Sequence, residues 1–233
     1  MPLTRNLGLV RKHSRAVRWM HWLNLPLLTL MLWSGLLIYW ANDVYRIGLG
    51  QHTLLHFFPD AVYARLHVDH RLAEGMALHF TLLWPFVLNG VAYCIFLALS
   101  GEWRDLAPRR HTLRDAWRVV LHDLHLARRP LAPVAKYNGA QRLAYTAVVL
   151  MGALSVVTGF AIYKPTQLAW LNSLLGGYPA ARWEHFLLSL GYLVFFVVHV
   201  AQVARAGWNN LRAMISGYEL PTTSPDVATG GKS

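Results

Sequence analysis

Four long apolar runs dominate the hydropathy pattern of the chain, and the first three contain no charged residue. They cover residues 19–42, 75–100, 143–163 and 183–206. The last run is uncharged between Glu184 and Arg205. Each run holds about 20 or more residues, the length that an α-helix needs to cross the hydrocarbon core of a bilayer. The pattern therefore predicts an all-α membrane protein, a four-helix transmembrane bundle with up-down connections.

Polar segments separate these runs and suggest how the chain is divided. We expect a basic N-terminal segment at residues 1–18, a four-helix domain at residues 19–207 and a C-terminal tail at residues 208–233. The tail is rich in Pro, Ser, Thr and Gly from residue 221, which predicts disorder there. In the connection between the second and third runs, residues 112–126 place apolar side chains at helical spacing. This spacing predicts an amphipathic helix on the membrane surface.

The composition favours a membrane protein over a soluble or nucleic-acid-binding one. Of 233 residues, 55% are hydrophobic and 14% are charged, and the mean hydropathy is +0.31. The net charge is +11, but no zinc-finger, helix-turn-helix or aromatic-basic repeat accompanies it, so we expect no nucleic-acid partner. No cleavable signal peptide is expected, because the first apolar run is too long for one.

One cysteine, Cys94, is present, and it lies in the second apolar run. A single cysteine excludes a disulfide, a Cys-based zinc site, an iron–sulfur cluster and a covalently attached haem within this chain. We expect Cys94 to be a small buried apolar side chain.

The distribution of Lys and Arg predicts the orientation in the membrane. Of 22 such residues, 17 lie in the N-terminal segment, in residues 102–142 and in the C-terminal part from Arg205. The other five lie in the two remaining connections, 43–74 and 164–182. Because loops rich in Lys and Arg stay in the cytoplasm, we expect both termini to be cytoplasmic.

Four histidines lie inside the apolar runs and sort by depth into two pairs. His185 and His199 are 14 residues apart, nearly four helical turns, so they share one face of the fourth helix about 21 Å apart. With both termini inside, His21 lies at the depth of His199 near the inner face, and His79 lies at the depth of His185 near the outer face. The sequence therefore predicts the pairs His21/His199 and His79/His185.

Two neutral imidazoles facing each other across a helical bundle suit a haem iron ligated on both axial faces. A zinc ion usually takes four ligands, which neither depth offers. A macrocycle between helices also needs small neighbouring residues, and Gly35 and Gly90 lie on or near the stripes of His21 and His79. These glycines are equally compatible with simple close packing of helices. Any one histidine taken alone is more often a hydrogen-bonded core imidazole than a ligand.

Four more histidines lie in the connection 43–74, as the pairs His52/His56 and His67/His70. Their spacing allows a metal to be gripped on a helical turn, but no carboxylate or thiol completes either set. We expect them to lie in a solvated loop or an interfacial helix. No residue set for acid–base or nucleophilic catalysis is apparent, so no catalytic residue is expected.

Several short segments resemble the bacterial di-haem cytochrome b561 superfamily: Arg18-Trp-Met-His21-Trp22, Leu78-His79-Phe80, Trp183-Glu-His185-Phe186 and Val198-His199-Val200. The chain is similar, over residues 12–218, to the membrane subunits of thiosulfate reductase and nickel–iron hydrogenase and to the gamma subunit of formate dehydrogenase. Asn89-Gly90 and residues 100–106 and 208–212 resemble the subgroup paired with a molybdopterin oxidoreductase. One departure is the long connection 43–74, where His67 and His70 compete with His79 as the ligand of the second helix.

The resemblance implies four helices that hold two b haems, with two ligands on the fourth helix. It implies a subunit in the bacterial inner membrane that passes electrons between quinone and a partner redox subunit, a molybdopterin or iron–sulfur protein. Arg18, Arg71 and Arg182 are candidates to bind the haem propionates at the membrane edge. Two alternatives stay open: a stand-alone quinone oxidoreductase, and a haem-free metal or proton transporter that uses the same histidines.

Overall fold

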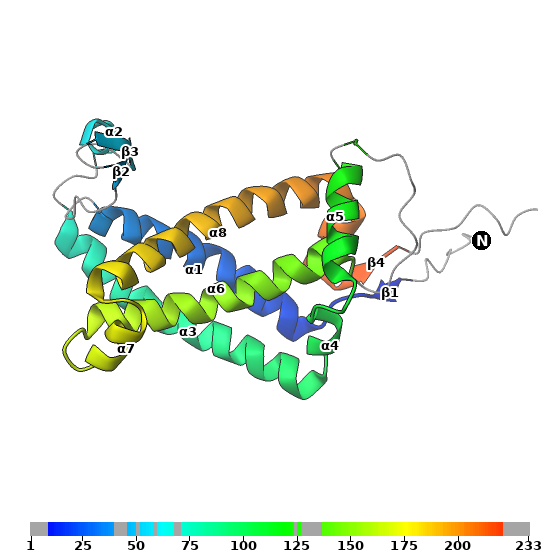
Figure 1. Cartoon of the computed structure of the whole chain (residues 1–233). Coiled ribbons are helices and arrows are strands. Elements are labelled where there is room, and N and C mark those ends of the chain that lie inside the picture. The colour runs from blue at the N-terminus through cyan, green and yellow to red at the C-terminus, as the bar shows by residue number, and fades with distance from the viewer. Residues whose placement is uncertain are drawn as a thin grey trace, which may run out of the picture.

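Four long helices run the length of the molecule and form its body (Figure 1). The computed structural model describes residues 9–39, 46–49, 52–57, 60–67, 71–123, 125–126 and 137–220. The long helices are α1 (Arg15–Tyr39), α3 (Leu72–Ser100), α6 (Gly139–Tyr163) and α8 (Tyr178–Ala206). Each is long and apolar enough to cross a membrane. The predicted four-helix transmembrane bundle is therefore confirmed.

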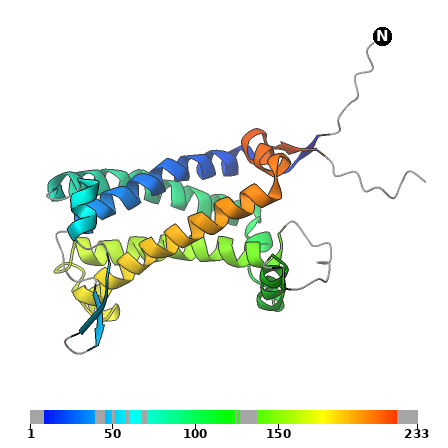
Figure 2. The same ribbon diagram turned by 90° about the horizontal axis from the view of Figure 1, so that it is seen from above.

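The helices are packed mainly in two pairs, α1 with α3 and α6 with α8. Helix α8 crosses the bundle obliquely (Figure 2), and its C-terminal end lies beside α5 (Thr112–Asp123), where Gln202 and Arg205 contact Asp123. Because of this crossing, one helix faces different neighbours at its two ends. Within the first pair, a Cβ on Gly75 would lie 2.7 Å from Cβ of Leu37. Glycine at position 75 therefore allows α1 and α3 to approach each other.

The first helix begins four residues before the apolar run that predicted it, at Arg15 rather than Trp19. Charged residues ended the predicted span, but they do not end the helix. Arg18 lies within the first turn and its guanidinium donates a hydrogen bond to the carbonyl of Ile215. Long basic side chains can extend from a membrane helix to the polar interface, so a helix can start before its apolar stretch.

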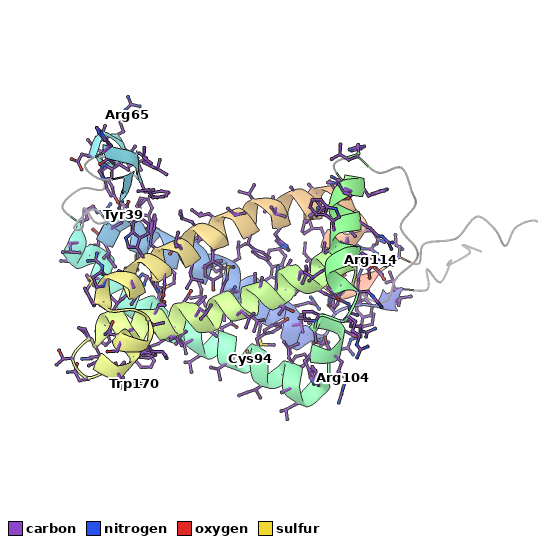
Figure 3. All side chains as sticks on the ribbon, in the orientation of Figure 1. Tyr39, Arg65, Cys94, Arg104, Arg114 and Trp170 are labelled. Atoms are coloured by element: carbon purple, nitrogen blue, oxygen red, sulfur yellow. The ribbon has the colours of Figure 1, made fainter. Side chains whose placement is uncertain are left out.

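The end of the bundle that holds both ends of the described chain is called the inner end here. Strand β1 (Val10–Arg11) pairs there with β4 (Tyr218–Glu219), and Lys12 forms an ion pair of 2.6 Å with Glu219. Helices α4 (Trp103–Leu106), α5 (Thr112–Asp123) and α9 (Trp208–Ser216) also lie at this end. The Arg104 and Arg114 side chains mark it in Figure 3.

Helix α5 is the amphipathic helix that the sequence predicted, and it crosses the inner end transverse to the long helices (Figure 1). It packs on α6 so closely that a Cβ on Gly139 would lie 2.6 Å from the backbone N of Ala116. Its exposed side carries an apolar stripe, with Trp117 64% exposed. That this stripe lies on the membrane surface stays a prediction.

A buried guanidinium ties the inner end together. Arg142, only 4% exposed, donates hydrogen bonds to the carbonyls of Ala107 (3.1 Å) and Arg104 (3.4 Å). The start of α6 is further fixed by a capping box, in which Asn138 and Gln141 each accept a hydrogen bond from the other's backbone N–H. These contacts hold the end of α4 and the loop after it against the start of α6.

The opposite, outer end carries a small cap. It consists of the antiparallel hairpin β2 (Arg46–Leu49) and β3 (His52–His56), helix α2 (Asp60–Leu66) and, between α6 and α8, helix α7 (Ala169–Leu174). The Tyr39 hydroxyl donates to the carbonyl of Phe57 (2.6 Å), and Tyr63 stacks on Tyr39. Phe186 packs against both Tyr39 and Phe57. Aromatic contacts therefore hold the cap on the ends of α1 and α8.

Two expectations about single elements need correction. The connection 43–74 was expected to be a solvated loop or an interfacial helix, but residues 46–49 and 52–56 form a hairpin. Cys94 was expected to be buried, but its side chain is exposed on the outside of α3 (Figure 3). An apolar run that spans a membrane has a lipid-facing side, so position within the run does not imply burial. The tail from residue 221 and residues 1–8 of the basic segment 1–18 lie outside the described residues.

The orientation that the distribution of Lys and Arg predicts can be tested directly with reporter fusions. We expect a fluorescent protein fused after residue 233 to be fluorescent in a bacterial host, and alkaline phosphatase inserted in the β2–β3 hairpin to be active. The reason is that the segments with 17 of the 22 Lys and Arg residues resist export. An inactive hairpin fusion together with an active phosphatase fused after residue 233 would reverse the orientation.

Candidate functional site

The outer half of the bundle contains the first predicted histidine pair. His79 on α3 faces His185 on α8, and their ring centroids are 6.3 Å apart with the ring planes at 69°. The two residues are 106 positions apart in the chain and are brought together only by the packing of the helices. The structure therefore places these two side chains as the depth argument predicted.

The second pair lies in the inner half. His21 on α1 faces His199 on α8, with ring centroids 6.0 Å apart and ring planes at 55°. His199 stacks on Phe195 at 5.5 Å, and His21 meets the edge of Trp22 at 5.3 Å. The oblique course of α8 explains why its two histidines have partners on two different helices.

The separation within each pair fits an ion held between two imidazoles. A bond between a metal ion and an imidazole nitrogen is about 2 Å long, and the nitrogen lies about 1 Å from the centre of its ring. Two imidazoles that bind one ion from opposite sides therefore have ring centroids about 6 Å apart. The observed values of 6.0 and 6.3 Å agree with this sum. Imidazoles in direct hydrogen-bond contact would leave no room for an ion. The donor set and its spacing therefore fit an iron porphyrin with two axial histidines.

Hydroxyl groups contact both outer rings at Nδ1. Ser34 Oγ lies 2.8 Å from Nδ1 of His79, and Thr158 Oγ1 lies 2.9 Å from Nδ1 of His185. The inner pair differs, since Nδ1 of His21 is buried without a hydrogen-bond partner. A ring held through Nδ1 leaves its Nε2 for a metal.

Small residues flank the outer pair. A Cβ on Gly35 would lie 4.0 Å from Cε1 of His79, and a Cβ on Gly159 would lie 3.4 Å from Cε1 of His185. Gly90 faces open space, because a Cβ there would meet nothing within 4 Å. Gly35 thus lies at the level of the outer pair, as its position on the stripe predicted, and neither it nor Gly90 is a site of tight helix contact.

The family model described as prokaryotic cytochrome b561 matches residues 12–217. The chain belongs to this family. It is therefore a multi-pass bacterial membrane protein of the b-type cytochromes.

Two relatives are similar along most of their length. One, from Azospira oryzae, is a "putative protein-methionine-sulfoxide reductase subunit YedZ1", 30% identical over 210 residues that cover 88% of this chain and 96% of the relative. The other, from Bradyrhizobium diazoefficiens, is a "probable Ni/Fe-hydrogenase B-type cytochrome subunit", 26% identical over 221 residues that cover 88% of this chain and 81% of the relative. No solved structure matches the chain.

The three arginines predicted to bind haem propionates lie in different settings in this cytochrome. Arg18 lies at the inner end, one turn from His21, and its Nε is buried without a hydrogen-bond partner. Arg71 is exposed and forms a bidentate ion pair with Glu74, so its donors are already engaged. The Arg182 guanidinium lies 5.7 Å from the ring centre of Tyr178. Arg18 therefore fits an anionic group best of the three.

Sequence reasoning missed Arg212 on α9. Its Nε is buried without a partner, like that of Arg18, and both lie at the inner end. A buried donor without an acceptor is costly in a protein, so it indicates an acceptor supplied by a bound group. No pattern in the sequence distinguishes Arg212 from the other basic residues near the inner face.

The remaining histidines give no support for a metal site. Among the residues that the structure describes, no three His, Cys, Asp or Glu side chains gather in a way that could hold a metal ion. His52 and His56 lie on strand β3 rather than on a helical turn. His67 follows α2, and His70 lies outside the described residues. Among the described histidines of the connection 43–74, namely His52, His56 and His67, none joins His79 in a group of three such side chains.

Proposed function

We propose that this protein is a di-haem b-type cytochrome subunit that passes electrons between membrane quinone and a partner redox subunit. The observation that carries the proposal is the presence of two facing histidine pairs, with ring centroids 6.3 and 6.0 Å apart, at two depths of one bundle. Helix α8 supplies one histidine to each pair, 14 residues apart, which separates the two levels by about 21 Å along the helix.

His79 and His185 would hold the outer haem, and His21 and His199 the inner one. A bound haem supplies one-electron chemistry at its iron, which no side chain of this protein provides. The protein holds the rings in facing positions and keeps water away from them with apolar helices. Arg18 and Arg212 offer cationic donors to the propionates at the inner end.

The names of the two relatives support a partner subunit. One is described as a subunit of a reductase and the other as a cytochrome subunit of a hydrogenase. Both relatives are named as subunits, and this supports a subunit role for the present chain over a stand-alone oxidoreductase. We propose a molybdopterin or iron–sulfur protein as the partner, and quinone as the diffusible partner in the membrane.

Haem content and electron transfer of the purified chain test the proposal. We expect two b haems per chain and reduction of both by a quinol. The reduced haems should be reoxidised by the electron acceptor of the partner complex only when the partner subunit is added. A protein without haem would contradict the cytochrome, and leave the metal or proton transporter as the better interpretation. Steady turnover with quinol and a soluble acceptor without any partner would favour the stand-alone oxidoreductase.

A further inference from the structure

The two helix pairs of the bundle are related halves. Helix α1 ends with Ser34-Gly-Leu-Leu-Ile-Tyr39 and helix α6 ends with Thr158-Gly-Phe-Ala-Ile-Tyr163. Both helices have 25 residues, and the next long helix in each half, α3 or α8, has 29. These matches in sequence, length and order indicate an internal repeat of α1–α3 in α6–α8.

The outer histidines occupy equivalent positions in this repeat. His79 follows the first residue of α3, Leu72, by seven positions, and His185 follows the first residue of α8, Tyr178, by the same number. Each is followed by a phenylalanine. The outer pair therefore joins the two halves at matching points, and each half contributes one ring.

The hydroxyl contacts are equivalent too. Within the first half Ser34 contacts His79 (2.8 Å), and within the second half Thr158 contacts His185 (2.9 Å). Ser34 and Thr158 are the first residues of the repeated six-residue segment, and both are almost completely buried. Two independent hydroxyl-to-imidazole contacts at the same repeat position are unlike the chance hydrogen bonds of a helix surface.

The direction of these hydrogen bonds follows from the single proton of each hydroxyl. Ser34 Oγ donates its proton to the carbonyl of Met31 (2.9 Å), and Thr158 Oγ1 donates to the carbonyl of Leu154 (2.8 Å). Each hydroxyl oxygen must then accept, so the ring nitrogen Nδ1 carries a proton and donates it. In both outer histidines Nε2 therefore keeps its lone pair, which is the form that binds a metal.

The inner pair breaks the repeat. In the register that aligns Ser34 with Thr158, His21 corresponds to Tyr145, and in the register that aligns His79 with His185, His199 corresponds to Tyr93. Nδ1 of His21 is buried and has no partner. His21 and His199 are therefore not repeat equivalents of each other, and the ring of His21 has no hydroxyl contact like those of the outer rings.

We propose that Ser34 and Thr158 are positioning residues of the outer haem, an inference that rests on the di-haem function proposed above. Each fixes the tautomer of one axial histidine and, by accepting its Nδ1–H, makes that ligand a stronger electron donor. Stronger axial donation stabilises the oxidised iron, so the two hydroxyls lower the reduction potential of the outer haem. The inner haem does not depend on them.

Two variants remove the hydroxyls with little change in shape. Thr158→Val keeps the volume of the side chain and removes the oxygen, and Ser34→Ala removes only the oxygen. Thr158→Ser is the converse variant, which keeps the oxygen and removes a methyl group. Ser189→Ala is the matched control, because the Ser189 hydroxyl donates to the backbone carbonyl of His185 (3.2 Å) rather than contacting Nδ1 of its ring.

The readout is a spectroelectrochemical titration of both haems in the full-length protein, with the outer signal assigned as the one lost in His79→Ala. We expect Ser34→Ala and Thr158→Val each to raise the midpoint potential of the outer haem. In the double variant the two shifts of this potential should add. At a fixed ambient potential the ratio of reduced to oxidised outer haem should rise several-fold, while the inner midpoint stays unchanged. Thr158→Ser and Ser189→Ala should behave as the unmodified protein.

Three results would overturn the proposal while leaving the di-haem function intact. These are two bound haems with unchanged midpoints in the double variant, equal shifts of both haems, or the same effect from Thr158→Ser as from Thr158→Val. If Thr158→Val loses the outer haem and Thr158→Ser keeps it, the hydroxyl is needed to position the ligand, which supports the proposal. If both lose it, packing rather than the hydroxyl is responsible and the proposal fails. Absence of haem from the unmodified protein would instead contradict the function itself.

Discussion

Replacing His185 with alanine is expected to reduce the haem content of the purified protein from two to one. His185 faces His79 with ring centroids 6.3 Å apart, and in the described part of the chain no third His, Cys, Asp or Glu joins them as a possible metal ligand. A haem held by His79 and His185, as proposed above, would keep only one of its two histidines and would be easily lost. The inner pair, about 21 Å away along α8, keeps both ligands. Pyridine haemochromogen analysis and the reduced b-type alpha band measure the loss.

The other three histidines complete this test. His79→Ala should remove the same haem as His185→Ala, and His21→Ala and His199→Ala should each remove the other one. His122→Ala is the control, because His122 lies on the short helix α5 at the inner end and outside the four spans. Loss of both haems in every variant, or loss of different haems in His79→Ala and His185→Ala, would refute the assignment of ligands.

The positions of the four histidines were predictable because they follow from helix geometry and depth alone. The 14-residue spacing places His185 and His199 on one face, and the alternating direction of four spans sets the depth of His21 and His79. These rules need only the boundaries of the apolar runs. The hairpin β2–β3 was missed because the connection 43–74 has no hydrophobic period long enough to show its structure.

The contacts around the rings could not be predicted in the same way. A hydrogen bond from His79 to Ser34, 45 positions apart, depends on how α1 and α3 are rotated against each other. The repeated segment that begins with Ser34 and Thr158 was nevertheless readable in the sequence, and comparing the halves would have found both residues. Arg71 shows the opposite case, since its position beside a span suggested a propionate partner, but its pairing with Glu74 three residues later satisfies it locally.

Replacing Gly159 with leucine is the second change with a large expected effect, because it fills the space beside the outer pair. A Cβ at this position would lie 3.4 Å from Cε1 and 3.8 Å from Nδ1 of His185, so alanine fits with a small adjustment. A leucine side chain must instead occupy the volume next to the ring, where a macrocycle needs room. We expect Gly159→Ala to keep two haems and Gly159→Leu to keep only the inner one, as measured by haem content and redox titration.

Gly75→Ala separates this effect from that of simple helix packing. The new Cβ would lie 2.7 Å from Cβ of Leu37 and 3.2 Å from the backbone N of Ile38, which forces α1 and α3 apart. Overpacking of this kind costs about 1–3 kcal/mol, so this variant should unfold at a lower temperature without selective loss of one haem. If Gly159→Leu behaves in the same way, with lower stability and equal loss of both haems, then Gly159 serves helix packing and is not part of a haem cradle.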